Sequence, residues 1–258
     1  MSTETNPFKA PAARVDDVYP GAGDFIPAGQ RVPAGNGIAW LGRGWHLFRR
    51  APGTWIGISA TFMAIMLVVA IIPLVNVLLN LLIPVFIGGI MIGCKALDNG
   101  EELTVGHLFA GFSGHTGNLV LIGLIYLAGI IAIVIVMALI GGGIGFSAAM
   151  LGSGKASGTA VGAGVAAMLI AMFFFVPLAM AVWYAPPLVV FHGMAPFQAV
   201  QASFFACLKN FAPFLVYGIV FVVLAILASL PLFLGWLVLM PVTQASVYAG
   251  YQDMFTRR

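Results

Sequence analysis

Two long stretches without charge dominate the pattern of hydrophobic and polar positions along the chain. Residues 54–94 and residues 211–251 each cover 41 positions that contain no Asp, Glu, Lys or Arg. A helix of that length would measure about 61 Å at about 1.5 Å per residue, twice the roughly 30 Å thickness of a bilayer's hydrocarbon core. Each stretch therefore predicts two membrane spans joined by a tight turn, which Pro73 and Pro231 mark because proline ends a helix.

Two further apolar segments lie between these predicted hairpins, joined by the Gly- and Ser-rich residues 141–161, which we expect to form a flexible connector. The chain is thus expected to be all-α and polytopic, with a transmembrane domain over 37–258. Residues 1–36 hold five prolines and four acidic residues without apolar periodicity, which predicts a disordered tail. The six expected spans are about 54–73, 75–94, 118–140, 162–185, 211–230 and 232–251.

Composition agrees with a membrane protein and excludes several other classes. Hydrophobic residues make up 61% of the chain and charged residues 7%, with a mean hydropathy of +1.06. A soluble domain carries about 25% charged residues. Nucleic-acid-binding, disordered and disulfide-scaffold proteins need polar surface or paired cysteines that this chain does not have. Cys94 and Cys207 are expected to stay reduced, because both fall on the predicted cytoplasmic side.

The distribution of basic residues predicts the orientation. Six spans put both termini on one side of the membrane, and that side holds ten of the eleven Lys and Arg residues, with Lys155 alone opposite. By the positive-inside rule both termini are cytoplasmic. The tips of the first and last hairpins are uncharged, so re-entrant hairpins that stop short of the far side would give the same charge distribution.

A short amphipathic stretch precedes each predicted hairpin, at 38–50, 104–112 and 196–209. The second helix of every hairpin also carries an interior proline that is expected to kink it. We interpret this as three copies of one unit, consisting of an interfacial helix, a straight span and a kinked span. The alternative is that proline is simply common in membrane helices. The three prolines are Pro84, Pro177 and Pro241.

The first amphipathic stretch illustrates how these helices are expected to sit. Its pattern places Leu41, Trp45 and Phe48 with Ile38 on one face, which predicts a helix lying in the membrane interface with that face in the headgroup boundary. The opposite face is basic. We expect Arg43, Arg49 and Arg50 to contact anionic lipid headgroups there.

Three segments carry a resemblance to a known family: Gly44 to Arg50, Cys94 to Gly100 with Leu108 to Phe112, and Ala185 to Val190. Over about residues 38–255 the chain resembles uncharacterised six-span proteobacterial inner-membrane proteins. More distantly it looks like the membrane domain beside some glycerophosphodiester phosphodiesterases. The resemblance implies a multi-pass protein of the bacterial inner membrane and supplies no catalytic or binding residues. The chain has no phosphodiesterase domain, so that activity is not expected.

Little in the sequence indicates catalysis. None of the six expected spans contains Asp, Glu, Lys or Arg, whereas ion-coupled carriers place ionisable groups inside the membrane. The four histidines come from separate segments without metal-ligand spacing. We therefore expect no catalytic residue, no metal site and no cofactor. Asn80 and Gln244 are deeply placed amides, which either hold helices together or line a polar cavity.

Two functions remain open at this point. The favoured hypothesis is a non-enzymatic inner-membrane protein of structural or accessory type, acting through helix packing and a basic cytoplasmic surface. The alternative is a transporter or translocase of a lipid-like or apolar small molecule. A continuous cavity reaching Asn80 and Gln244 would favour the transporter, and a close-packed interior the structural role. The expected partners are the bilayer, its anionic headgroups and either another membrane protein or a second copy of the chain, but not nucleic acid.

Overall fold

The computed structural model describes residues 24–71, 73–150 and 156–257. Within its helices, the side chains of residues 70, 73–78, 80, 140–150 and 156–166 lie outside the description. The described residues are mainly helical, and an isolated bridge between Phe25 and Thr256 is their one β-type pairing. The helices are α1 (Asn36–Arg50), α2 (Pro52–Ala70), α3 (Pro73–Asp98), the 3₁₀ helix η1 (Val105–Phe112), α4 (Thr116–Met150), α5 (Ala156–Trp183), α6 (Ala185–His192), α7 (Pro196–Lys209), α8 (Phe211–Ser229) and α9 (Trp236–Phe255).

Several of these helices are long and apolar enough to cross a membrane, which confirms the all-α membrane class. In the described part of the chain five segments qualify, and α9 is not among them. The expected count of six is therefore not confirmed and stays a prediction. The five segments are Pro52–Val69, Leu81–Asp98, Thr116–Leu139, Ala167–His192 and Phe211–Ser229.

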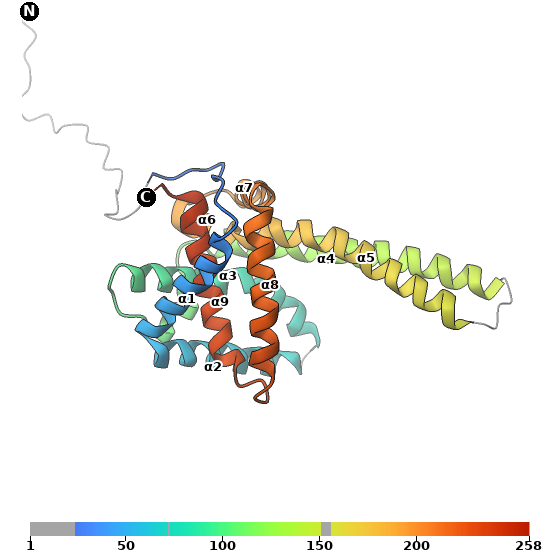
Figure 1. The fold of residues 1–258 in the computed structure, drawn as a ribbon, viewed down its shortest axis with the longest axis horizontal. Coiled ribbons are helices and arrows are strands. Elements are labelled where there is room, and N and C mark those ends of the chain that lie inside the picture. The colour runs from blue at the N-terminus through green and yellow to red at the C-terminus, as the bar shows by residue number, and fades with distance from the viewer. Residues whose placement is uncertain (1–23, 72, 151–155, 258) are drawn as a thin grey trace, which may run out of the picture.

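Helix α9 lies inside the protein, which explains its more polar sequence. It packs against α1, α2, α3 and α8 (Figure 1), and its buried residues include Tyr248, Tyr251 and Phe255. A helix surrounded by other helices has less lipid to face, so it can carry hydroxyl and amide groups that find partners in the protein. One such pair is the Tyr217 hydroxyl of α8 and the Ser246 hydroxyl of α9, 2.8 Å apart.

The expected apolar face of the first amphipathic helix is divided between two surroundings, because Ile38 and Trp45 are exposed as a lipid-facing placement requires, whereas Leu41 and Phe48 are buried in the protein. In α1, Ile38 and Trp45 are 56% and 46% exposed, while Trp40 and Leu47 are buried against the rest of the protein. Helix α1 approaches α9 closely at Gly44, since a methyl group there would lie only 2.4 Å from the Val242 carbonyl oxygen. Small residues let membrane helices approach, so they mark the protein-facing side better than large apolar residues do.

Helix α7 follows the same rule. Its buried face consists of small side chains, among them Ala199, Ser203 and Ala206, and it lies on α5. Phe197 and Leu208 point outward instead. In a bilayer such large apolar residues can face lipid at little cost.

The three short helices pack on long helices in a regular way. Helix α1 makes its most extensive contacts with α9, η1 with α3, and α7 with α5. Each short helix therefore lies against the second long helix of a different hairpin, not against its own. The expected interior prolines Pro84, Pro177 and Pro241 lie within α3, α5 and α9, and the bends expected at them stay predictions.

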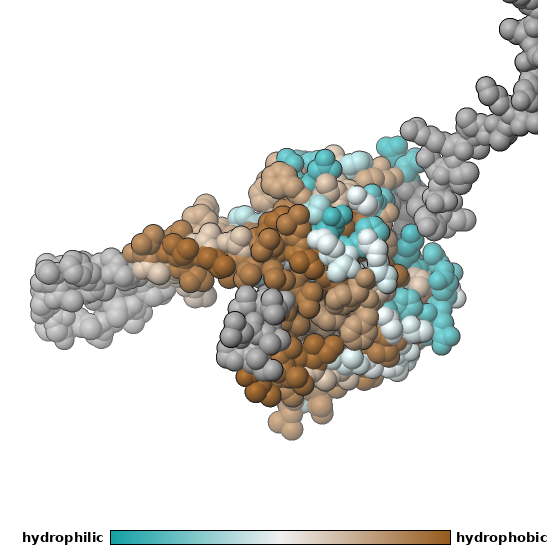
Figure 2. Space-filling model, turned by 180° about the vertical axis from the view of Figure 1, so that it is seen from behind, coloured by the Kyte–Doolittle hydropathy of each residue, from teal (hydrophilic) through white to brown (hydrophobic). Residues whose placement is uncertain are grey.

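Helices α4 and α5 form a long hairpin that projects from the other helices (Figure 1). The expected connector at 141–161 is too long, because α4 continues through Gly141 to Gly145 and ends at Met150, and α5 begins at Ala156. A helix satisfies its backbone groups internally, which favours its continuation through glycines in apolar surroundings. Figure 2 shows hydrophobic surface on the part of this hairpin that adjoins the other helices, and hydrophilic surface near the start of the described chain.

A break separates α5 from α6 at Tyr184. The Ser203 hydroxyl of α7 donates to the Met180 carbonyl (2.7 Å) and accepts from the Tyr184 N–H (2.9 Å). These two backbone groups are four residues apart, so the hydroxyl stands where a helical hydrogen bond would otherwise form. Pro186 and Pro187 follow and have no N–H to donate.

The expected tail boundary at residue 36 lies too far along the chain. Residues 1–23 are outside the described residues, but residues 24–35 run over α7 and α9. The Ile26 N–H donates to the Phe255 carbonyl and the Gln30 N–H to the Met254 carbonyl, each at 2.8 Å. Hydrogen bonds to helix ends hold this polar segment without an apolar core of its own.

Candidate functional site

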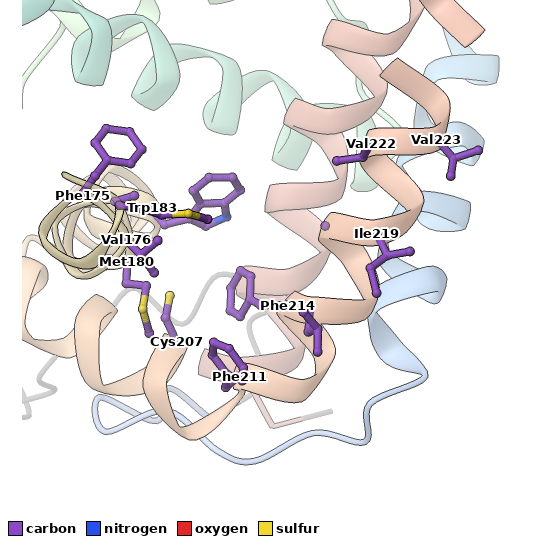
Figure 3. Close-up of a pocket in the computed structure, with 14 residues that line it drawn as sticks. Phe175, Val176, Met180, Trp183, Cys207, Phe211, Phe214, Ile219, Val222 and Val223 are labelled. Atoms are coloured by element: carbon purple, nitrogen blue, oxygen red, sulfur yellow. The ribbon is translucent and has the colours of Figure 1, made fainter. Parts of the chain in front are cut away.

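The described residues form an apolar groove between α5 and α8. Its volume is about 620 Å³, and its lining includes no charged side chain. Figure 3 shows Trp183 of α5 pointing toward α8 and Met180 of α5 pointing toward Cys207 of α7, with Phe214 of α8 pointing back into the gap. The residues that line the groove are Met172, Phe175, Val176, Ala179, Met180 and Trp183 of α5, Cys207 of α7, and Phe211, Phe214, Leu215, Gly218, Ile219, Val222 and Val223 of α8.

The groove is wedge-shaped. Helix α8 begins two residues after α7 ends, and α5 lies on α7, so the two walls meet at α7 and diverge from there (Figure 1). A second hollow of about 450 Å³ shares Met172, Met180 and Phe211 with the groove and extends toward Leu208. Together they form a continuous apolar surface around the end of α7.

Cys207 is the one thiol in this groove, and its chemistry is unsuited to catalysis. Burial raises the pKa of the Cys207 thiol to about 12, although a hydrogen bond with Ser203 acts in the opposite direction. The thiol is therefore neutral near pH 7, and the neutral form is a poor nucleophile. The groove can hold an apolar molecule, but its lining offers no acid, base or activated nucleophile.

Gln244 lies between two smaller hollows. One, of about 200 Å³, is lined by residues of α2, α3 and α9, and the other, of about 140 Å³, by residues of α5, α8 and α9. Trp183 lines both the second hollow and the large groove. The Asn80 side chain falls outside the described residues, so the expected cavity joining Asn80 to Gln244 stays untested.

A polar anchor joins α1 to α9 near the chain ends. One carboxylate oxygen of Asp253 accepts hydrogen bonds from Asn36 Nδ2 (2.9 Å) and Trp40 Nε1 (2.8 Å) and pairs with Arg43 Nη2. The three donors lie at positions i, i+4 and i+7 of α1, hence on one face. Arg43 was expected to contact lipid headgroups, but it pairs with Asp253 inside the protein. Without Arg43 the negative charge of the largely buried Asp253 would have no cation beside it.

A second polar cluster brings α3, α6 and α9 together. Gln252 Nε2 donates to Asp98 (2.8 Å), and His192 Nε2 lies 2.6 Å from the Tyr251 hydroxyl. Lys95 Nζ lies 5.1 Å from the centre of the Phe191 ring, within the range of a cation–π interaction. These contacts tie the ends of three helices together and indicate a structural role.

Other candidate residues lie apart from these sites. Arg49 and Arg50 are exposed at the end of α1, so the structure leaves them available for headgroups. In the described ranges, no three His, Cys, Asp or Glu side chains are grouped as metal ligands would be. The absence of a metal, a cofactor and catalytic residues stays a prediction.

Sequence reasoning missed both the groove and Asp253. The groove depends on how far apart two helices lie, which hydropathy does not record. Asp253 did leave a signal, since it is the sole acidic residue between Glu102 and the end of the chain. A lone carboxylate at the end of an apolar helix needs a cation or several donors.

Comparisons with known proteins agree with the class that the fold defines. Its apolar helices, of which five in the described part of the chain are long enough to span a bilayer, are those of an integral membrane protein. The chain is 31% identical over 229 residues to a probable inner membrane protein of Burkholderia thailandensis, and the alignment covers 84% of this chain and 82% of the relative. The chain therefore belongs to the same bacterial inner-membrane family. No family model and no solved structure matches it, and the expected distant likeness to a phosphodiesterase-associated domain is not confirmed.

Proposed function

We propose that this inner-membrane protein is not an enzyme and that it binds a lipid-like molecule in the groove between α5 and α8. The single observation that carries the proposal is the groove itself, a wedge of about 620 Å³ without a charged side chain in its lining. Water gains no hydrogen bonds from such a lining, so in a bilayer the wedge is filled by hydrocarbon. The protein is thereby suited to hold or pass on an apolar or amphipathic molecule.

We further propose that the chain consists of three equivalent units, each an interfacial helix followed by a straight and a kinked span. The support comes from three matching contacts between a short helix and a long one. A methyl group at Gly44 of α1 would lie 2.4 Å from the Val242 carbonyl oxygen of α9, and one at Gly111 of η1 would lie 2.0 Å from that of Val85 in α3. In α7 the corresponding place is taken by Ser203, which bonds the Met180 carbonyl.

The arrangement of the three units places the groove at the junction between two of them. In two junctions the straight helix of one unit packs on the kinked helix of another, α2 on α9 and α4 on α3. At the second of these a methyl group at Gly123 would lie 2.4 Å from the Leu81 carbonyl oxygen. The third junction, between α8 and α5, holds the groove instead. The proposal is thus a ring of three units with one open junction.

The second candidate function is the structural or accessory role, acting through helix packing and a basic surface. It is favoured by the well-packed interior, where Leu108, Leu119 and Leu188 have no exposed surface. It is also consistent with the exposed Arg49 and Arg50. The two functions differ in what they require of the groove, since a purely structural role needs no bound lipid.

Native mass spectrometry of the protein purified in mild detergent tests the proposal. A Cβ atom at Gly218 would have no neighbouring atom within 4 Å, and Gly218 lines the groove, so the ring of Gly218→Phe is expected to enter the groove and fill part of it. Wild-type protein should retain lipid, and Gly218→Phe should lose most of it. Ala132→Phe adds the same ring on an exposed position of α4 and should retain lipid as wild type does. Equal retention by all three proteins would refute lipid binding in the groove.

A further inference from the structure

We propose that the molecule in the groove is an anionic phospholipid, with one acyl chain between α5 and α8 and its headgroup at Lys209 and Arg31. This inference rests on the proposed function and specifies its ligand. It commits to a lipid of the leaflet that lies on the same side as the chain ends. Three features support it, namely the reach of the groove, the residues at its narrow end and the charge beside that end.

The groove has the reach of one leaflet. On α8 its lining extends from Phe211 to Val223, about 18 Å at about 1.5 Å per residue, and on α5 from Trp183 back to Met172, about 17 Å. Half of the roughly 30 Å hydrocarbon core is about 15 Å. A single acyl chain entering from one membrane surface would therefore occupy the groove and end near the bilayer centre.

The narrow end of the groove lies where a membrane surface is expected. Trp183 stands there, 38% exposed, at the end of α5, and an indole prefers the level of the headgroups. The last residue of α7, Lys209, and Asn210 after it are polar, and the groove residue Phe211 follows them at the start of α8. The acyl chain can thus start at this end while its headgroup remains in the polar zone.

Two basic residues, Lys209 and Arg31, lie near the narrow end of the groove. Lys209 lies between Leu208 and Phe211, both part of the apolar lining, and its Nζ donates to the Ala28 carbonyl at 2.8 Å. An ammonium has three donors, so this bond does not use its full capacity. The Lys209 backbone therefore lies beside the start of the groove, and its ammonium lies at the Ala28 carbonyl of the segment that precedes α1.

Arg31 is brought to the same end by the segment that precedes α1. The Val32 N–H donates to Asn210 Oδ1 (2.8 Å), and Asn210 Nδ2 donates to the Gln30 carbonyl (2.9 Å). These bonds hold both neighbours of Arg31 against the residue that follows Lys209, and the Arg31 side chain is exposed. Two cations beside an apolar groove complement an anionic headgroup with an attached chain.

Quenching of tryptophan fluorescence by brominated lipids tests this ligand. The full-length protein is reconstituted into vesicles that contain either brominated phosphatidylglycerol or brominated phosphatidylcholine. The part of the quenching that disappears in Trp183→Phe reports lipid in the groove. In the wild type this part should be stronger with phosphatidylglycerol, and Gly218→Phe should abolish it with both lipids.

Charge variants then test the headgroup site. Lys209→Gln and Arg31→Gln should each lower the preference for phosphatidylglycerol about fivefold, which corresponds to about 1 kcal/mol per basic residue near an anionic surface. Lys209→Arg should keep the preference, which separates charge from folding. Arg50→Gln, an exposed cation on α1, is the matched control and should leave the Trp183 signal unchanged.

The possible failures are distinguishable. Equal quenching by the two lipids, or no response to Lys209→Gln and Arg31→Gln, would overturn the anionic ligand and leave a groove that binds lipid. A Trp183 signal that survives Gly218→Phe would overturn the proposed function as well. A dimer that Gly218→Phe converts to monomers would show that a second copy fills the groove, which would also overturn the proposal.

Discussion

The anchor around Asp253 gives the sharpest prediction on stability. Asp253 lies in the last turn of α9 and holds three donors of α1, so its removal affects the most extensive helix contact among the described residues. Asp253→Ala would leave the Arg43 guanidinium without its carboxylate. Arg43→Met, in contrast, would leave Asp253 with the Trp40 and Asn36 hydrogen bonds. The two substitutions break the same pair and should have unequal effects.

The structure sets the size of each effect. Hydrogen bonds to charged groups contribute about 1.5–3 kcal/mol each. The sum of three such bonds is an upper limit, because the contributions of neighbouring bonds are not additive. The Arg43 and Asp253 side chains are 28% and 16% exposed, which moderates the roughly 3–5 kcal/mol cost of breaking a fully buried pair. We expect Asp253→Ala to lower the free energy of unfolding by about 3 kcal/mol.

Arg43→Met should cost less, about 1–2 kcal/mol. Arg43 Nε is buried without a hydrogen-bond partner among the described residues, and the substitution removes that unfavourable group together with the ion pair. The double variant should be more stable than the sum of the single changes indicates, because the unpaired guanidinium is then gone. A coupling energy of about 1–2 kcal/mol is the expected result.

Unfolding in mild detergent, titrated with sodium dodecyl sulfate and followed by helical circular dichroism, measures these differences. Circular dichroism is preferable to tryptophan emission because Trp40 bonds Asp253 directly. Glu101→Ala, at an exposed position beyond α3, is the control and should change stability by no more than about 0.5 kcal/mol. An Arg43→Met cost equal to or above that of Asp253→Ala, or purely additive effects, would refute the reasoning.

Three further predictions concern packing, lipid contact and orientation. Gly44→Ala should lower the Tm because its methyl group would meet the Val242 carbonyl, whereas Gly42→Ala in the same helix meets no atom within 4 Å and should be neutral or stabilising. Replacing both Arg49 and Arg50 by Glu should weaken α1 contact with anionic membranes, read as increased protease access, and unchanged access would contradict this. A cysteine in the tail before residue 24 should resist an impermeant reagent on whole cells while one at Ser153 reacts, and the reverse pattern would disprove the orientation.

The sequence was sufficient for the membrane class because hydropathy is the property that a bilayer selects. Charge-free stretches predicted α2, α3 and α8 within a few residues of their observed bounds. The predicted span 162–185 also lies within α5 and the start of α6. These elements depend on local composition alone, which any single sequence contains.

The helix faces could not be predicted in the same way. Hydrophobic periodicity identifies the side of a helix that avoids water, but in a membrane both lipid and protein avoid water. Leu41 and Phe48 were therefore assigned to the headgroup boundary although they are buried in the protein, and small residues such as Gly44 and Ser203 proved to be protein-facing as well. The pairing of Arg43 with Asp253 joins residues 210 positions apart, and no local pattern records such a contact.

The groove follows from one interruption of a helix more than from the residues that line it. In α9 and α3 the helix continues past the residues that lie beneath Gly44 and Gly111. At the third contact Ser203 brings a hydroxyl, which takes both backbone partners of the helical bond between Met180 and Tyr184. With that bond replaced, and two prolines following, α6 stays packed with the protein while α5 leaves in another direction with α4 (Figure 1). The divergence of α5 from α8 opens the wedge, so the proposed lipid site is a consequence of how a single serine and the proline pair end one helix.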